Sequence, residues 1–271
     1  MGAAGIVLCG GKSSRMGRAK ACLPWRGQPM VAHVVSILRP IVDDVVVVAS
    51  DALELPALDA RVVRDREPAL GPLAGIREGL EEIDSDFAFV TGTDVPFLSP
   101  DFVKALLSYG CAAAPEIDGH VQTLAAVYPR AASQRIAAML AAGQARPLRL
   151  LEELDYRKVS ASELPDPQSV RGFNTPAEYL AAVREFEARP TAILEFQGLA
   201  RSALGKSEIE VPVGTIGDVL APLQSSISIL EDDAIAGLFS VSLNGRSIGA
   251  STAIPVGPGE RVRVVDAAAR H

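Results

Sequence analysis

The sequence predicts an α/β protein, with a Rossmann-like three-layer domain built on a mostly parallel sheet and a second, small α+β domain. Apolar runs at residues 4–8, 45–49 and 87–91 predict buried strands. A helical pattern separates the first two runs, so the β-loop-α-β order predicts a right-handed crossover and a parallel pair. After residue 190 the strands become short and alternating, and Asn244-Gly245 between two of them predicts a hairpin.

Composition limits the class of protein. The 271 residues are 48% hydrophobic and 22% charged, which is typical of a globular chain of one or two domains. A net charge of −7 argues against a general nucleic-acid binder. Three cysteines without a C-x-x-C pair favour reduced thiols, and no apolar span of 18 residues or leader pattern occurs. We therefore expect a cytoplasmic protein that binds neither membrane nor nucleic acid.

The elements of the first domain follow from periodicity. Pro29 opens a helix because apolar residues recur at helical spacing up to Leu38. A last helix begins at Pro176, with Thr175 as its N-cap. The other elements expected here are helices at 71–83, 100–109, 131–142 and 147–155 and strands at 62–63, 111–115 and 119–128.

A basic, glycine-containing loop follows the first strand. Gly10 and Gly11 allow positive φ and a close approach of backbone N–H groups to a ligand. Four cations lie within nine residues, with no carboxylate among them: Lys12, Arg15, Arg18 and Lys20. This combination predicts a polyphosphate site. Neither a Walker loop nor a dinucleotide fingerprint fits the spacing.

A carboxylate follows the third strong strand. Asp94 lies in the segment Gly92-Thr93-Asp94-Val95-Pro96, and we expect it at the same sheet edge as the glycine loop. Mg²⁺ takes one or two such oxygen ligands together with substrate phosphates. Seen alone, Asp94 would be a turn-capping residue. The neighbouring phosphate loop favours Asp94 as a Mg²⁺ ligand.

The loop resembles a known signature. G-G-x-S-x-R-M-G-x-x-K after the first strand is similar to the signature of nucleotidyltransferases that join an NTP to a phosphorylated acceptor. Together with Leu8-Cys9-Gly10-Gly11, G-P-L-A-G at 71–75 and T-D-V-P-F at 93–97, it most resembles the molybdenum cofactor guanylyltransferases over about the first 185 residues. The resemblance implies transfer of GMP from GTP to molybdopterin, with release of pyrophosphate.

The resemblance also implies a set of site residues. Lys20, Arg15 and Asp94 would be catalytic, with Mg²⁺ held by Asp94. His120 and Asn174 would face the acceptor, although His120 could be a loop residue without a role and Asn174 part of a helix cap. Asp65 could equally be a solvated turn residue. The nucleotide would contact Leu8, Cys9, Gly10, Gly11, Lys12, Lys20, Asp65 and Asp94.

A charged stretch after the last helix predicts a domain boundary, giving domains at 1–188 and 191–271. The second domain resembles the ubiquitin-like β-grasp of the molybdopterin synthase small subunit and related sulfur carriers. The resemblance lies in L-A-R-S-A-L-G at 199–205, T-I-G-D-V-L at 215–220, S-L-N-G at 242–245 and P-G-E-R-V at 258–262.

Those carriers end in Gly-Gly, whereas this chain ends in D-A-A-A-R-H at 266–271. We therefore expect the carriers' fold without sulfur transfer. The domain would serve as a docking or stabilising module, with the molybdopterin synthase large subunit or molybdenum insertion proteins as partners.

The choice of nucleotide base and the enzymatic activity itself each have an alternative interpretation. Val48 and Ala19 depart from the pattern of the better-known guanylyl enzymes, which place a polar residue and an Asp there. A cytidylyltransferase or a nucleotidyltransferase for another small acceptor is the competing enzymatic interpretation. A non-catalytic nucleotide-binding scaffold for molybdopterin synthase is the alternative from another class.

Overall fold

The computed structural model describes residues 2–10, 15–65, 70–232 and 234–267. The chain forms two compact units, and each contains segments that are distant in the sequence. The described part of the first unit is 2–10, 20–22, 29–65 and 70–172. The described part of the second unit is 15–19, 23–28, 173–232 and 234–267.

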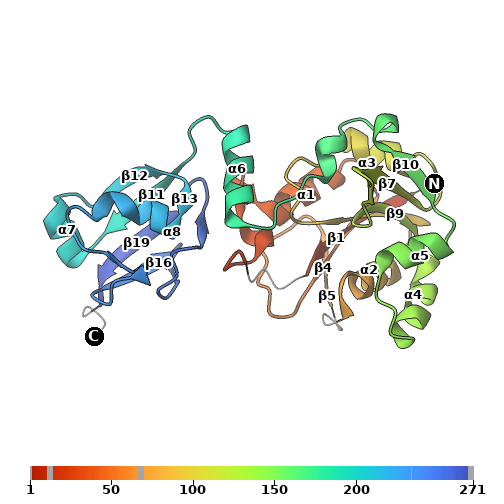
Figure 1. Ribbon diagram of the computed structural model, residues 1–271. Coiled ribbons are helices and arrows are strands. Elements are labelled where there is room, and N and C mark those ends of the chain that lie inside the picture. The colour runs from red at the N-terminus through yellow and green to blue at the C-terminus, as the bar shows by residue number, and fades with distance from the viewer. Residues whose placement is uncertain (1, 11–14, 66–69, 233, 268–271) are drawn as a thin grey trace. The chain divides into compact units, whose positions relative to one another are not determined.

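The first unit is built on one mixed sheet (Figure 1). Its strands are β1 (Ala3–Cys9), β4 (Asp44–Ala49), β5 (Arg61–Arg64), β6 (Phe87–Gly92), β7 (Ala113–Ile117), β8 (His120–Val121), β9 (Ala125–Pro129) and β10 (Arg157–Ser160). They lie in the order β10-β7-β9-β6-β1-β4-β5, with β8 paired to β7. β6, β1, β4 and β5 are parallel, and β9 is antiparallel to β6 and β7.

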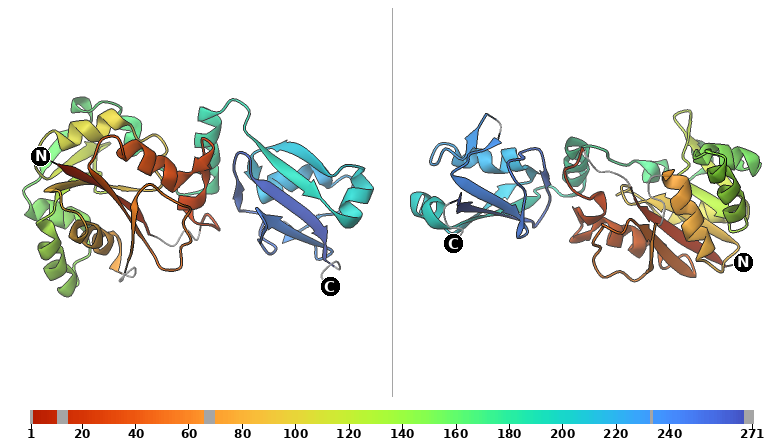
Figure 2. Two further views of the ribbon diagram at one scale, coloured as in Figure 1. Left: turned by 180° about the vertical axis from the view of Figure 1, so that it is seen from behind. Right: turned by 90° about the horizontal axis from the view of Figure 1, so that it is seen from below.

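Helices cover both faces of this sheet, as Figures 1 and 2 show. They are α1 (Met30–Leu38), α2 (Pro72–Glu81), α3 (Pro100–Leu107), α4 (Ala132–Ala141) and α5 (Pro147–Glu153). Alternate residues of β1 point to opposite faces: Val7 packs in the core with α1 and α3, whereas Ile6 packs with α2, α4 and α5. The predicted three-layer α/β fold is confirmed.

The local signals explain where the helices begin. Met30, Val34 and Leu38 are each completely buried, as the helical spacing after Pro29 predicted. At α3, Ser99 caps the helix by accepting a hydrogen bond from the backbone N–H of Phe102. These elements could therefore be located without any tertiary information.

The antiparallel side of the sheet differs in detail from the sequence prediction. The strand expected at 119–128 is two strands, β8 and β9, and the strand expected at 111–115 begins at Ala113. Strand β10 was not predicted, because only Val159 of its four residues is buried and no alternation marks it. Its pairing with β7 is a long-range contact that local pattern does not reveal.

The second unit holds a five-stranded sheet in the order β12-β11-β19-β16-β17. The strands are β11 (Thr191–Phe196), β12 (Glu208–Pro212), β16 (Phe239–Leu243), β17 (Arg246–Ser247) and β19 (Arg261–Asp266). Its helices are α6 (Pro176–Phe186), α7 (Gly198–Leu204) and α8 (Ile216–Leu220). Short pieces complete it: β2 (Pro24–Trp25), β13 (Gly214–Thr215), β14 (Leu230–Glu231), β15 (Ala234–Ile235) and β18 (Pro255–Val256), while β3 (Gln28–Pro29) leads into α1.

Two local predictions are confirmed in this unit. Thr175 caps α6 by accepting a hydrogen bond from the N–H of Glu178, in a capping box. Asn244 and Gly245 connect β16 to β17 with φ of 49° and 82°, the positive pair that a tight hairpin turn requires. The unit is therefore a small α+β fold, as expected.

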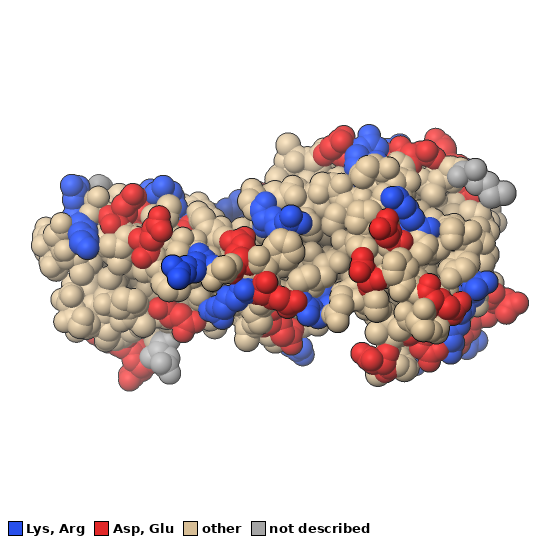
Figure 3. All heavy atoms as spheres, turned by 90° about the horizontal axis from the view of Figure 1, so that it is seen from above, with Lys and Arg blue, Asp and Glu red and all other residues tan. Residues whose placement is uncertain are grey.

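The distribution of charge and the apolar length of the helices are two further properties of the described residues. Acidic and basic side chains are interspersed on the face drawn in Figure 3. On that face, the described residues of each unit therefore form no extended field of one sign. Over the residues that the structure describes, no helix combines the length and apolar character needed to cross a membrane.

Candidate functional site

The parallel part of the first unit's sheet changes winding direction at β1. The chain runs from β1 to β4 and β5 on one side, and it returns to β6 on the other side of β1. In open α/β sheets, ligands bind beyond the carboxyl ends of the strands at such a switch point. The residues that follow β1 and β6 therefore define the candidate site.

Both stretches that the sequence singled out begin at this point. Leu8 of β1 is the partner of Gly92 of β6, so Gly10 and Asp94 each lie two residues beyond a paired position. Leu8 and Cys9 are buried, and Gly10 is exposed. Gly11 and Lys12, also predicted to contact the nucleotide, lie outside the described residues.

Two glycines pack closely against Asp94. A Cβ added at Gly92 would lie 2.9 Å from Asp94 Oδ1, and one added at Gly172 would lie 2.9 Å from the main-chain oxygen of Asp94. The second contact is with backbone, which cannot swing aside as a flexible side chain can. The Asp94 side chain is still 32% exposed, so its carboxylate can be reached from solvent.

Lys20 brings a cation to this carboxylate. It begins the short 3-10 helix η1 (Lys20–Cys22), and its Nζ donates a hydrogen bond to Asp94 Oδ2 at 2.8 Å. The Lys20 side chain is 18% exposed, so solvent screens the pair only partly. Two residues separated by 74 positions thus form one ion pair at the switch point.

The turn after Asp94 is braced from two directions. His33 on α1 is buried, and its Nε2 lies 3.1 Å from the carbonyl oxygen of Pro96, to which it donates a hydrogen bond. The Arg171 guanidinium stacks on the ring of Phe97, with 3.8 Å between its central carbon and the ring centroid. Both contacts restrict movement of the turn.

Replacing His33 by alanine should lower the free energy of unfolding by roughly 1–3 kcal/mol, because the buried Pro96 carbonyl loses a donor. Chemical denaturation measures this change. His120→Ala is the control, since His120 is exposed and its loss should change stability by less than about 0.5 kcal/mol. Equal midpoints for the two variants would show that His33 does not brace the turn.

Cys9 is a packing residue. Burial raises the pKa of its thiol, and the neighbouring Cys22 raises it further, so the reactive thiolate is disfavoured. At pH 8 we expect an alkylating reagent to modify the exposed Cys111 at least about tenfold faster than Cys9. Mass spectrometry of the peptides measures both rates, and comparable rates would contradict this interpretation.

Asp65 lies at the same edge of the sheet. It follows β5, is 8% exposed, and its backbone N–H donates to the carbonyl oxygen of Ala49, the last residue of β4, at 2.8 Å. Asp65 is therefore not a solvated residue, as the alternative interpretation expected, because it is buried. The carboxyl ends of β6, β1, β4 and β5 thus carry Asp94, Gly10 and Asp65 along one edge.

The remaining predicted residues lie on other elements. Arg15, the third residue predicted to be catalytic, is exposed in a turn of the second unit. His120 is exposed on β8, where Nδ1 lies 2.8 Å from the Asp118 carbonyl oxygen. Asn174 is exposed just before α6, and its N–H donates to Glu178 of the capping box at 2.6 Å. Their roles stay predictions.

Asp94 would need help to hold a cation. Among the described residues, no three His, Cys, Asp or Glu side chains cluster closely enough to form a metal site by themselves. Mg²⁺ does not require such a cluster when phosphate oxygens and water complete its octahedron. A single, partly exposed carboxylate at the switch point fits that donor set.

Sequence reasoning missed two features of this site. The contact between Lys20 and Asp94 could not be inferred, because the sequence separation says nothing of distance. The hydrogen bond from His33 to Pro96 likewise joins residues 63 positions apart, so no local pattern indicates it.

Comparisons with known proteins agree with this geometry. Residues 5–159 match the family model of the MobA-like NTP transferase domain. A protein of Mycobacterium ulcerans named "Probable molybdenum cofactor guanylyltransferase" is 35% identical over 190 residues, which cover 67% of this chain and 93% of that protein. A relative with the same name from Mycobacterium avium is 35% identical over 187 residues, covering 66% and 93%.

A solved structure shows the same fold. Molybdopterin-guanine dinucleotide biosynthesis protein A from Archaeoglobus fulgidus superposes with a TM-score of 0.56 at 23% identity, covering 66% of this chain and 96% of that one. The family model matches more than half of this chain, and the curated relatives are covered almost completely. With its switch-point glycine loop and Asp94 turn, the chain belongs to the MobA-like NTP transferase family.

Proposed function

We propose that this nucleotidyltransferase transfers GMP from GTP to molybdopterin and releases pyrophosphate. The observation that carries the proposal is the Lys20–Asp94 pair at the switch point, where a basic glycine loop and a carboxylate turn meet. The curated relatives, which are named molybdenum cofactor guanylyltransferases, support the choice of base and acceptor.

The ion pair brings two opposite charges together at the switch point. Lys20 and Asp94 neutralise each other at 2.8 Å, so neither charge is left alone in a partly buried place. A triphosphate would offer Lys20 new anionic oxygens, and a divalent cation would compensate Asp94 instead. The pair would then separate, with Lys20 on the α-phosphate and Asp94 on the cation.

The reaction joins the terminal phosphate of molybdopterin to the α-phosphorus of GTP, and the bond from that phosphorus to the β-phosphate oxygen breaks. Such transfers require alignment and compensation of negative charge more than covalent help from the protein. Backbone N–H groups at Gly10 and Gly11 would orient the triphosphate. Lys12 and Arg15 would neutralise the departing pyrophosphate.

Mg²⁺ is the cation that this donor set suits, with Asp94 as its protein ligand. Bound there, it would supply charge stabilisation at the phosphate oxygens. Asp65 would contact the nucleotide from the neighbouring strand end. His120 and Asn174 would contact the acceptor.

The second domain, residues 191–271, would be a β-grasp module following a nucleotidyltransferase domain at 1–188. Two strand pairs with helices between them support this assignment. The module would dock a partner in the cytoplasm. The molybdopterin synthase large subunit and molybdenum insertion proteins are the partners to test.

A pyrophosphate-release assay with purified protein, Mg²⁺, molybdopterin and each NTP in turn tests the proposal. Release that requires GTP and molybdopterin together is the expected result. Release with CTP instead would make the enzyme a cytidylyltransferase, and release with another phosphorylated acceptor would change the acceptor. Nucleotide binding without turnover, with co-purification of molybdopterin synthase, would favour the non-catalytic scaffold.

A further inference from the structure

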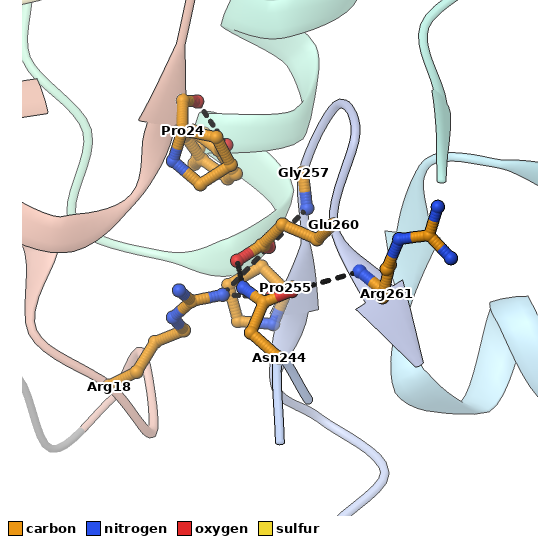
Figure 4. A network of polar contacts seen from close by, with 8 residues as sticks. Arg18, Pro24, Asn244, Pro255, Gly257, Glu260 and Arg261 are labelled. Carbon is orange, nitrogen blue, oxygen red and sulfur yellow. Dashed lines mark hydrogen bonds and ion pairs between the residues drawn. The ribbon is translucent and has the colours of Figure 1, made fainter. Parts of the chain in front are cut away.

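Arg18 belongs to the basic loop but its charge is already engaged. In the second unit, Arg18 Nη1 donates to Glu260 Oε2 at 2.8 Å and lies 3.4 Å from the carbonyl oxygen of Pro255 (Figure 4). The Arg18 side chain is 18% exposed and the Glu260 side chain 5%. A nearly buried carboxylate from residue 260 therefore holds one of the four cations that the sequence had assigned to a polyphosphate.

Glu260 is itself firmly held. Its Oε1 accepts a hydrogen bond from Asn244 Nδ2 at 2.8 Å, and its Oε2 accepts one from the backbone N–H of Gly257 at 2.8 Å (Figure 4). Asn244 sits in the β16–β17 hairpin. A carboxylate with these donors has little freedom to move, so it offers Arg18 a fixed anchor.

The residues around the Arg18–Glu260 ion pair are closely packed. A Cβ at Gly17, where φ is +65°, would lie 2.9 Å from Ile254 Cγ1. A Cβ at Gly257 would lie 2.2 Å from the Tyr179 hydroxyl and 2.5 Å from Pro24 Cγ, and that hydroxyl donates to the Pro24 carbonyl oxygen at 2.6 Å. Residues on both sides of Lys20 in the sequence are therefore packed against the turn at 254–260.

We propose that Glu260 is a positioning residue for the nucleotide site: through Arg18 it fixes the loop that carries Arg15 and Lys20, and so sets the affinity for the triphosphate. This inference rests on the proposed function. It gives a residue of the C-terminal module, Glu260, a role in GTP binding. Arg18 precedes Lys20 by two residues, a distance over which a fixed backbone restricts where the lysine can reach.

The direct alternative is that Arg18 binds phosphate. The two roles predict opposite outcomes for Glu260→Gln. If Arg18 binds phosphate, loss of the Glu260 charge frees the guanidinium, and GTP affinity stays the same or rises. If Glu260 positions the loop, GTP affinity falls and Arg18→Met reduces it to the same extent.

The experiment compares Glu260→Gln, Arg18→Met, the double variant and Glu195→Gln in the full-length protein. Glu195 is the control because it also pairs with arginines, Arg261 and Arg263, but within the sheet of the second unit. We expect KM for GTP to rise about tenfold in both single variants, with kcat changed less than about threefold. The double variant should show no further rise, since both changes break one contact.

Hydrogen exchange provides a readout that does not depend on turnover. Amides of residues 15–20 should exchange about tenfold faster in Glu260→Gln and Arg18→Met than in Glu195→Gln, while β11 and β19 stay protected in all. Unchanged exchange in both variants would overturn the inference. A fall in GTP affinity confined to Arg18→Met would also overturn it. If the wild-type protein releases no pyrophosphate, the proposed function fails and hydrogen exchange still decides the positioning role.

Discussion

Asp94→Asn is expected to lower kcat for pyrophosphate release about 10²–10³-fold while leaving the fold intact. The amide retains the shape of the side chain but loses the charge that would hold the cation and pair with Lys20. Because the Asp94 side chain is about one-third exposed, we expect less than about 1 kcal/mol of lost stability. Steady-state kinetics at varied Mg²⁺ and thermal unfolding measure the two effects.

Asp101→Asn is the matched control for this variant. Asp101 also pairs with a lysine, lying 3.5 Å from Lys104, but it is on the exposed surface of α3. The kcat of the Asp101→Asn variant should stay within about twofold of the wild-type value. Near-normal turnover in Asp94→Asn would remove the proposed metal role.

Lys20→Met is the second variant with a large expected effect. Methionine keeps much of the apolar stem but cannot neutralise the α-phosphate, so we expect kcat/KM for GTP to fall about 10²–10³-fold. Single-turnover measurements at saturating GTP would separate weaker binding from slower chemistry. We expect mainly a slower chemical step and little weakening of GTP binding, because negative charge accumulates at the α-phosphate as the reaction proceeds.

Lys104→Met is the corresponding control, because it removes an exposed lysine from the Asp101 pair. It should bind GTP and turn over like the wild type. The two active-site variants act on one arrangement, so Lys20→Met combined with Asp94→Asn should cost less than the sum of the separate losses. Fully additive losses would indicate that Lys20 and Asp94 act at separate places.

Local chemistry made many elements of both units predictable. The continuous apolar run of β1 and the helical spacing after Pro29 in the first unit, and the Thr175 cap in the second, depend on neighbours within a few residues. Strand β10 was not predicted, because a polar edge strand is defined by the strand it pairs with. The sequence of β10 carries no alternation.

The sequence by itself determined the α/β class, the glycine loop after β1 and the carboxylate after β6, because short-range patterns and the rules of parallel sheets specify them. Only the tertiary structure decided which charges meet. Lys20 pairs with Asp94 and Arg18 with Glu260, although the two cations are two residues apart and looked equivalent in the loop. Ion pairing depends on distances between atoms that lie 74 and 242 positions apart, and folding alone sets those distances.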